Sequence, residues 1–595
     1  MTRRFPRGIG RLLRLALLGN SRRIASELST LWKIQVLLRI LPNETSRVFA
    51  ATLAMGALCG LVAVAFHGSL QWSTNRVAQF LASLPAAARM LGIVVLPGIA
   101  AWIAGVVLVR SRLPAAGSGI PQVKALMADR IPVFGLRVGA MKLVLSVIQI
   151  AGGGSLGREG PTVQICASMV PRMLRVFALP KGMLTRFLPV ASAAGIAAAF
   201  NTPVAAVTFV MEEFMGSSTS TAMTGLVVAA AIAAIEEKLL LGGQPLFHVP
   251  PWSFDSLASL PSFLVLGILG GLLGVLFHRG LLSLRSWIRG LTRFTSPFRM
   301  ALGGVFSGFA ALLAWKLLGS EGIAGPGYAL LDGSLNETLN FTQSAGLLPL
   351  KFLATLASYS SGGVGGIFSP VLAIGSLLGG AVGWLQRGFP WADTTPIGAF
   401  ALVGMGTFFA AVIRAPITSV LIIFELTGNY GLILPLMLAN MAAFLISKRM
   451  NPVPIYEALL LQDGIEPHPD TKDKWPTVGA LCRRDIPTVQ TDASIQDLVE
   501  LDPATPCAVL DRDGTLLGLL QPHRDIASHR GKAGECIQTS ARLREDDLAL
   551  PALSLMAQER HRWLPVIDRS GRLAGAFGTH EALAALSTMD GRKRD

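Results

Sequence analysis

Charge is scarce in this sequence. Only 15% of the 595 residues are Asp, Glu, Lys or Arg, whereas 51% are hydrophobic. An average soluble domain has about 25% charged residues, so this shortage excludes an ordinary soluble protein and indicates a polytopic membrane protein. The uncharged runs that approach or reach the roughly 20 residues needed to cross a bilayer as a helix include 48–66, 91–109, 260–277 and 394–413.

Patterns of metal binding and covalent catalysis are also missing. The five cysteines (59, 166, 482, 507 and 536) form no CxxC pair and have no His-x-x-x-His partner, so they predict neither a disulfide framework nor a zinc site. No HExxH, GxSxG or His-rich motif occurs in the apolar part. No glycine-rich loop there ends in Gly-Lys-Ser/Thr, as a nucleotide P-loop does. The sequence therefore predicts no metal, no cofactor and no catalytic residues.

Positive charge is present in excess, with a formal net charge of +16. Ten Lys or Arg precede the first apolar run, between Met1 and Arg47, against only Glu27 and Glu44. The positive-inside rule puts this end in the cytoplasm. Beside a membrane helix, anionic lipid headgroups explain the basic residues better than a nucleic acid does. We expect residues 1–47 to be a basic cytoplasmic segment.

The apolar part repeats itself. With an offset of 209, a lysine, three glycines and a proline recur, namely Lys142, Gly153, Gly154, Gly157 and Pro161 at Lys351, Gly362, Gly363, Gly366 and Pro370. With an offset of 213, residues 201–212 match 414–425, each with a proline followed nine residues later by a glutamate. Transporters commonly contain such repeats, so we expect membrane repeats at 48–240 and 241–460.

Three glycine-rich loops each end in a proline that can start a helix: Gly117-Ser-Gly-Ile-Pro121, Gly152 to Pro161, and Gly362 to Pro370. Helix N-termini carry unpaired N–H groups and about half a positive charge, so several that converge can bind an anion such as chloride. The second loop contains Glu159, a carboxylate that costs about 2.5–3.5 kcal/mol inside a membrane and therefore indicates a function. Phe368 takes its place in the second repeat.

Four segments resemble, in order and approximate spacing, the selectivity filter of the CLC chloride channel and transporter family: Gly117-Ser-Gly-Ile-Pro121, Gly157-Arg-Glu-Gly-Pro161, Gly366-Ile-Phe-Ser-Pro370 and Pro454-Ile-Tyr456. The resemblance covers about residues 45 to 460. It implies an all-α polytopic membrane protein of two inverted repeats of broken and tilted helices. It also implies a homodimer with one pathway per subunit.

The resemblance implies roles for single residues. Ser118 and Tyr456 would offer hydroxyls to a central chloride, and backbone N–H groups around Ile367 and Phe368 would complete its shell. Glu159 would be the gate, filling an anion position when ionised and swinging aside when protonated. The other implied filter positions are Gly117, Gly119, Ile120, Pro121, Gly157, Arg158, Gly160, Pro161, Gly366 and Pro370. A structural ion pair of Arg158 with Glu159 is the alternative, although adjacent helical residues point in different directions.

Glu213 distinguishes an exchanger from a channel. In the resembled family, exchangers generally have a glutamate here as the inner proton acceptor; the alternative is a solvated helix end, and neighbouring Glu212 is interpreted as structural. We therefore expect a chloride/proton antiporter. A passive chloride channel, gated by voltage or pH, and a membrane-embedded enzyme remain alternatives. By the same resemblance, Ser118 favours chloride over nitrate, and Pro161 differs from the fluoride-exporting branch.

From about Asp470 the chain is densely charged, which predicts a soluble α+β region. Two similar units, 486–528 and 539–586, each contain a helix-like stretch and two β-rich pieces around a turn, Asp511-Arg-Asp-Gly514 or Asp568-Arg-Ser-Gly571. They resemble the paired cystathionine-β-synthase (CBS) domains of many CLC proteins. We expect a linker at 461–475, a first domain at 476–531, and a second domain with the tail at 532–595. We also expect a multi-pass protein of a bacterial inner (plasma) membrane, with its N-terminus and these domains in the cytoplasm.

The tail's ligand is left open. The segments at 518–525 and 575–581 differ from the adenine-nucleotide motif, because a hydroxyl is missing or displaced and one acidic residue is shifted. A possible adenine nucleotide and a role in dimer contact are the two interpretations.

Overall fold

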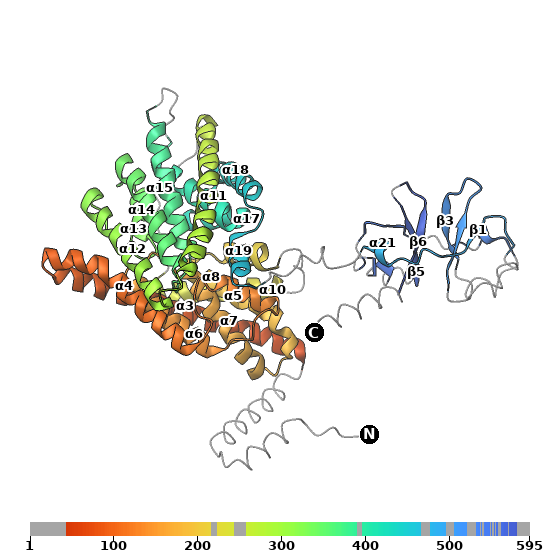
Figure 1. The fold of residues 1–595 in the computed structure, drawn as a ribbon, viewed down its shortest axis with the longest axis horizontal. Helices are drawn as coiled ribbons and strands as arrows, with labels where there is room; N and C mark the ends of the chain where they lie inside the picture. Colours follow the sequence, from red (N-terminus) through yellow and green to blue (C-terminus); the bar gives the residue numbers. More distant parts are fainter. Residues whose placement is uncertain are drawn as a thin grey trace, which may run out of the picture. The chain divides into compact units, whose positions relative to one another are not determined.

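The computed structural model describes residues 43–215, 223–242, 257–388, 395–465, 477–494, 505–520 and, with short gaps, 531–579. The chain divides into two compact units, Met1–Pro467 and His468–Asp595. Each is described by itself (Figure 1). Most of the basic N-terminal segment and most of the expected linker lie outside the described residues.

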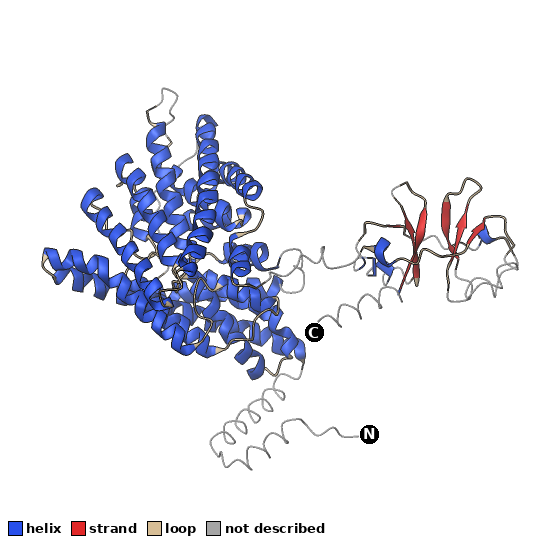
Figure 2. Cartoon of the chain, viewed as in Figure 1, coloured by secondary structure: helices blue, strands red, loops and turns tan. Residues whose placement is uncertain are grey.

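The first unit is built of helices (Figure 2). Its first half contains α3 (Glu44–Ser83), α4 (Ala86–Ser111), α5 (Ile120–Met127), α6 (Leu136–Ala151), α7 (Glu159–Val176), α8 (Leu184–Phe200), α9 (Pro203–Val210) and α10 (Met223–Leu241). Its second half contains α11 (Leu260–Gly290), α12 (Ser296–Leu318), α13 (Tyr328–Leu335), α14 (Phe341–Ser360), α15 (Phe368–Gln386), α16 (Ile397–Ile413), α17 (Pro416–Thr427), α18 (Ile433–Met450) and α19 (Ile455–Gln462).

Membrane-spanning character is confirmed by length and composition. Seven of the described helical segments are long and apolar enough to cross a bilayer, and α16 and α17 are shorter apolar helices. The uncharged runs of the sequence fall in α3, α4, α11 and α16. Short helices of eight residues (α5, α9, α13 and α19) and helices with an internal proline (α4, α7, α8 and α14) confirm the expected broken helices.

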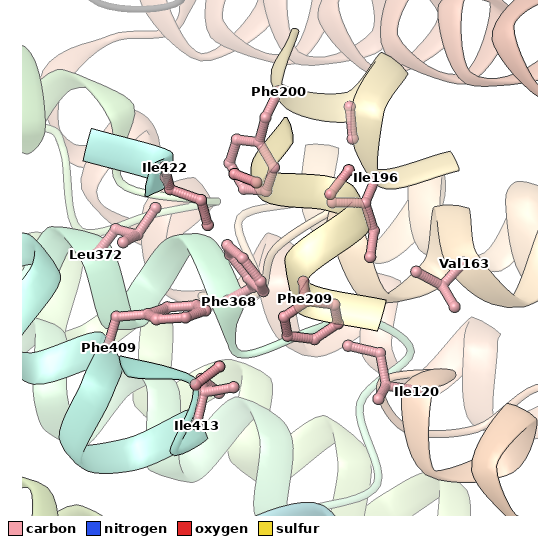
Figure 3. Packing of buried hydrophobic residues seen from close by; sticks show 14 of the residues in the cluster. Ile120, Val163, Ile196, Phe200, Phe209, Phe368, Leu372, Phe409, Ile413 and Ile422 are labelled. Carbon is pink, nitrogen blue, oxygen red and sulfur yellow. The ribbon is translucent and has the colours of Figure 1, made fainter. Parts of the chain in front are cut away.

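The two halves pack in the same way. α3 packs on α10 as α11 packs on α18, and α7 packs on α8 as α15 packs on α16. α4 and α12 pack against each other across the halves. The main hydrophobic core includes Phe368, whose ring centroid is 4.8, 5.7 and 4.5 Å from those of Phe200, Phe209 and Phe409 (Figure 3).

The matched glutamates of the two halves exchange contacts. The carboxylate of Glu212 accepts the N–H groups of Ile417 and Thr418, at 3.1 and 2.8 Å, where α17 begins. Glu425 accepts those of Val204 and Ala205, at 2.9 and 2.7 Å, where α9 begins. Each short helix therefore receives from the other half an acceptor for its free N–H groups. This supports the interpretation of Glu212 as structural.

The second unit contains two three-stranded sheets of the same design. β1 (Thr488–Gln490) is parallel to β2 (Cys507–Leu510), which is antiparallel to β3 (Leu516–Leu520). β4 (Leu543–Arg544), β5 (Trp563–Ile567) and β6 (Leu573–Gly578) repeat the pattern. The predicted turns close both hairpins, with Gly514 and Gly571 at φ +77° and +84°. The expected tandem α+β module is thus confirmed.

The sheets share a small core with residues from both repeats, including Ala508, Leu519 and Ala576. Burial raises the pKa of Cys507 to about 11, which keeps this thiol protonated near neutral pH. The helix-like stretches expected around 494–501 and 548–559 lie largely outside the described residues, as does 521–525 of the first candidate nucleotide segment, whereas 575–579 of the second is described and lies mostly in β6.

The exchanged caps give a testable prediction. Glu425→Ala should lower the free energy of unfolding by about 1 kcal/mol, because two N–H groups lose their acceptor. Glu425→Gln keeps a carbonyl oxygen and should lose less. Thermal unfolding in detergent, followed by tryptophan fluorescence, measures the effect. Glu321→Gln, which removes only an exposed pair with Arg89, is the control and should change little. Equal midpoints for Glu425→Ala and wild type would contradict the capping role.

Candidate functional site

The predicted glycine loops meet in the interior of the first unit. Gly157 and Gly366 exchange two backbone hydrogen bonds, each 2.7 Å. Gly117 donates to Gly363 at 3.1 Å and accepts from Gly365 at 3.2 Å. The three loops are thereby joined by short backbone bridges, so that segments more than 200 residues apart form one site.

Three helices begin at these loops, α5 at Ile120, α7 at Glu159 and α15 at Phe368. Only glycine permits so close an approach. A Cβ at Gly119, which has φ +105°, would lie 2.6 Å from the carbonyl oxygen of Gly160. The converging N-termini bring free N–H groups and partial positive charge to one buried region.

Two hydroxyls in this region have no hydrogen-bond partner. Ser118 and Tyr456 are fully buried, and neither the Oγ nor the phenol oxygen has a hydrogen bond of normal distance and angle among the described residues, although the two hydroxyls are close enough to interact with each other. α19 packs against α5, which brings Tyr456 beside Ser118. Buried polar groups normally have partners, so two unsatisfied hydroxyls side by side indicate a place for a ligand that accepts hydrogen bonds.

Ile367 and Phe368 stand at the start of α15, both buried. The Phe368 ring is held by the aromatic contacts described above (Figure 3). Because this ring is fixed, the backbone at the helix start is held in place beside the glycine bridges.

Glu159 lies among the loops and is 1% exposed. Its Oε1 accepts hydrogen bonds from the Tyr328 hydroxyl, at 2.9 Å, and from the Ser369 hydroxyl. Its Oε2 has no hydrogen-bond partner. This oxygen lies against Gly157, so that a Cβ added at Gly157 would be 2.5 Å from Oε2. The carboxylate therefore occupies the meeting point of the loops.

Arg158 does not neutralise this carboxylate. Its guanidinium donates to the carbonyl of Ala199 at 3.0 Å and lies 5.7 Å from the centre of the Tyr328 ring. No ion pair joins Arg158 to Glu159, and both side chains are among the described residues. The alternative of a structural pair between these neighbours is therefore wrong.

The two repeat-related lysines are buried and support loops. Lys142 donates to the carbonyls of Ala115 and Gly117, at 3.0 and 2.5 Å. Lys351 donates to those of Ile323 and Gly325, at 2.9 and 2.7 Å. Their ammonium groups donate to backbone oxygens of the loops and therefore do not point at the unpaired hydroxyls.

Glu213 is also buried but belongs to a second cluster. It lies in a π-helical turn, η2 (Met211–Met215), that continues α9. Its Oε1 accepts from Lys124 Nζ at 2.9 Å, and the same nitrogen donates to Glu457 at 2.8 Å. One lysine thus bridges two carboxylates. The alternative of a solvated helix end is wrong for this residue, because its side chain is only 6% exposed.

Sequence reasoning missed four side chains of these clusters: Lys124, Glu457, Tyr328 and Ser369. Lys124 and Glu457 had a usable signal, because each is a charge close to a filter motif in an apolar part of the chain. Ser369 lies inside a quoted motif but was not assigned a role. Tyr328 belongs to no motif that the repeat made visible.

A protein with this fold and site, in which helix starts and free hydroxyls surround a buried carboxylate, is an ion-transport protein of the CLC class. The chain belongs to the CLC family, since the family model described as Voltage gated chloride channel matches residues 99–448. Members of this family are ion channels and transporters.

Solved structures agree with this assignment. A slow cyanobacterial Cl⁻/H⁺ antiporter is 28% identical, with a TM-score of 0.64, over 70% of this chain and 98% of that one. A eukaryotic CLC transporter is 22% identical (TM-score 0.62, 90% and 98% covered). A CLC-type fluoride/proton antiporter is 24% identical (TM-score 0.56, 70% and 98% covered). The last two likenesses show the fold.

The seat of the Glu159 carboxylate can be tested at Gly157. Gly157→Ala should displace the carboxylate, because the new Cβ would lie 2.5 Å from Oε2 and 3.2 Å from Pro370 Cδ. An electron cryomicroscopy map of the variant would show the side chain in another rotamer. Gly68→Ala, where no atom lies within 4 Å of the new Cβ, is the control. An unmoved carboxylate in Gly157→Ala would contradict the geometry.

Proposed function

We propose that this protein is a chloride/proton antiporter in which Glu159 gates the anion pathway and relays protons with Glu213. The observation that carries the proposal is the position of Glu159. Its carboxylate is buried at the point where three helix N-termini converge, and one of its oxygens is unpaired. A carboxylate held in a region built for anions can be exchanged for one.

The anion site supports chloride as the substrate. Ser118 and Tyr456 supply free hydroxyls, and the starts of α5, α7 and α15 supply N–H groups. Neutral donors bind a halide weakly enough to release it, which fast transport requires. We propose chloride at this position, with Ile367 and Phe368 contributing backbone N–H groups, and chloride rather than nitrate or fluoride as the preferred anion.

The proposed proton pathway is based on the positions of Glu159 and Glu213, which both lie near Tyr456. Glu159 and Glu213 both act electrostatically on the Tyr456 hydroxyl. Both carboxylates are buried, and a carboxyl group can accept and release a proton. Lys124 holds Glu213 at its inner position. Protons would pass between the two carboxylates while chloride moves the other way.

Similarity supports an exchanger rather than a passive channel. The cyanobacterial relative, which is 28% identical, is described as a Cl⁻/H⁺ antiporter. By its resemblance to the family, Glu213 is also expected to be the inner acceptor of exchangers. A passive channel of the same family is the alternative, and a measurement of proton and chloride flux distinguishes it from an exchanger.

We further propose that the N-terminus and the second unit lie in the cytoplasm of a bacterial cell whose inner membrane holds the first unit as a homodimer. The second unit is interpreted as a CBS pair. Dimer contact is its proposed role, and an adenine nucleotide is the ligand class to be tested.

Coupling is tested with purified protein in liposomes. A chloride gradient should drive protons uphill in wild type. Glu213→Gln should abolish proton movement and leave chloride flux, because the inner acceptor is lost. Glu159→Gln should abolish proton movement and remove the pH dependence of chloride flux, because the gate can no longer ionise. A pH electrode and a chloride electrode record both fluxes at once.

Glu212→Gln is the matched control, since it changes the adjacent glutamate but keeps an oxygen acceptor for the start of α17. It should retain coupling. Proton movement that persists in Glu213→Gln would exclude Glu213 as the acceptor. If the wild-type protein moves chloride without protons, the protein is a channel.

A further inference from the structure

The structure repeats the Ser118 loop in its second half. Gly325 and Gly327 correspond to Gly117 and Gly119, with φ of +65° and +94° against +73° and +105°. Lys351 donates to the carbonyl of Gly325 as Lys142 does to that of Gly117. This glycine match has an offset of 208, and the lysine match has an offset of 209. The two alignments therefore differ by a single residue.

Packing fixes the position of this second loop. A Cβ at Gly327 would lie 2.8 Å from both Ala373 Cβ and Lys351 Cε. The loop is thus pressed between α14 and α15, and Tyr328 follows directly as the first residue of α13. The lysine and the glycine together determine where the Tyr328 hydroxyl lies.

The two loops present different groups. The first presents the unpaired hydroxyl of Ser118. The second presents Tyr328, whose hydroxyl donates to Glu159 Oε1 at 2.9 Å and lies 3.3 Å from Ser369 Oγ. Ser369 donates to the same carboxylate oxygen. Two hydroxyl donors therefore converge on one oxygen of the proposed gate, and both come from the second repeat.

We propose that Tyr328 and Ser369 form a hydroxyl clamp that holds the ionised Glu159 carboxylate in the anion pathway and so sets the proton concentration at which the pathway opens. This proposal rests on the proposed function, in which Glu159 is the gate. Both are positioning residues, because they act through the carboxylate and do not carry the proton themselves.

Loss of the clamp should shift the pH at which the pathway opens in one direction only. Hydrogen bonds donated to a carboxylate stabilise its ionised form. The other charged or titratable groups around it are Arg158 at the start of α7 and Tyr456 on α19. Arg158 donates to Ala199, so the two hydroxyls supply the hydrogen bonds recorded for this carboxylate. Without one of them, Glu159 should take up a proton and leave its seat at a lower proton concentration.

The test is chloride efflux from liposomes containing the full-length protein, measured with a chloride electrode across external pH 4 to 8. Tyr328→Phe and Ser369→Ala should each move the midpoint of activation upward by about one pH unit, as expected for the loss of one hydrogen bond to a charged group. Ser369→Thr keeps a hydroxyl and should restore the wild-type midpoint. Tyr430→Phe, at an exposed tyrosine, and Ser376→Ala, at a buried serine of the same helix that bonds Ala373, are matched controls.

A test in the Glu159→Gln variant distinguishes failure of the clamp proposal from failure of the gate assignment. In Glu159→Gln, adding Tyr328→Phe should cause no shift in pH dependence, since the amide cannot ionise even though it still accepts the hydroxyls. A wild-type midpoint in both single variants would overturn the clamp, as would a lower rate without a shift. Full pH dependence in Glu159→Gln alone would overturn the gate assignment instead. Ser369→Ala decides the matter if Tyr328→Phe does not fold.

Discussion

The constraint on which the structure depends is the supply of donors and acceptors where helices break inside an apolar unit. Water cannot satisfy a freed backbone group there, so the protein must do so itself. Lys142 and Lys351 donate to the carbonyls of two loops, and Glu212 and Glu425 accept the N–H groups of two helix starts. Once these groups are satisfied, the starts of α5, α7 and α15 and the hydroxyls of Ser118 and Tyr456 remain beside one another in the buried region where we propose that an anion binds.

Sequence alone could predict the parts of this arrangement that recur or that are costly. The lysines, the glycine loops and the paired glutamates recur at offsets of 209 and 213, and Glu159 is a charge among apolar runs. These signals gave the helical membrane class, the repeat and the loops that meet. The β-rich pieces around the two repeated glycine turns likewise indicated the tandem sheets of the second unit.

Other parts could not be predicted, because they depend on which side chains meet across long separations. Lys124 and Glu457 are 333 residues apart, and nothing local shows that one nitrogen bridges Glu457 and Glu213. Tyr328 is hidden because Ser118 aligns with Pro326 and Ile120 with Tyr328, so the loops share geometry without sharing polar residues. The sequence separated Glu212 from Glu213, but the partners of each, the start of α17 for Glu212 and Lys124 for Glu213, appear only in the structure.

The exchange of carboxylates between α9 and α17 has the symmetry of a twofold contact, in which each half gives the other what it receives. A chain that ended after the first repeat would keep Glu212 but lose the oxygens that Glu425 supplies to Val204 and Ala205. A second copy of that half-length chain, turned to face the first, would restore them with its own Glu212. The two halves of this chain therefore bond to each other as two equal subunits would.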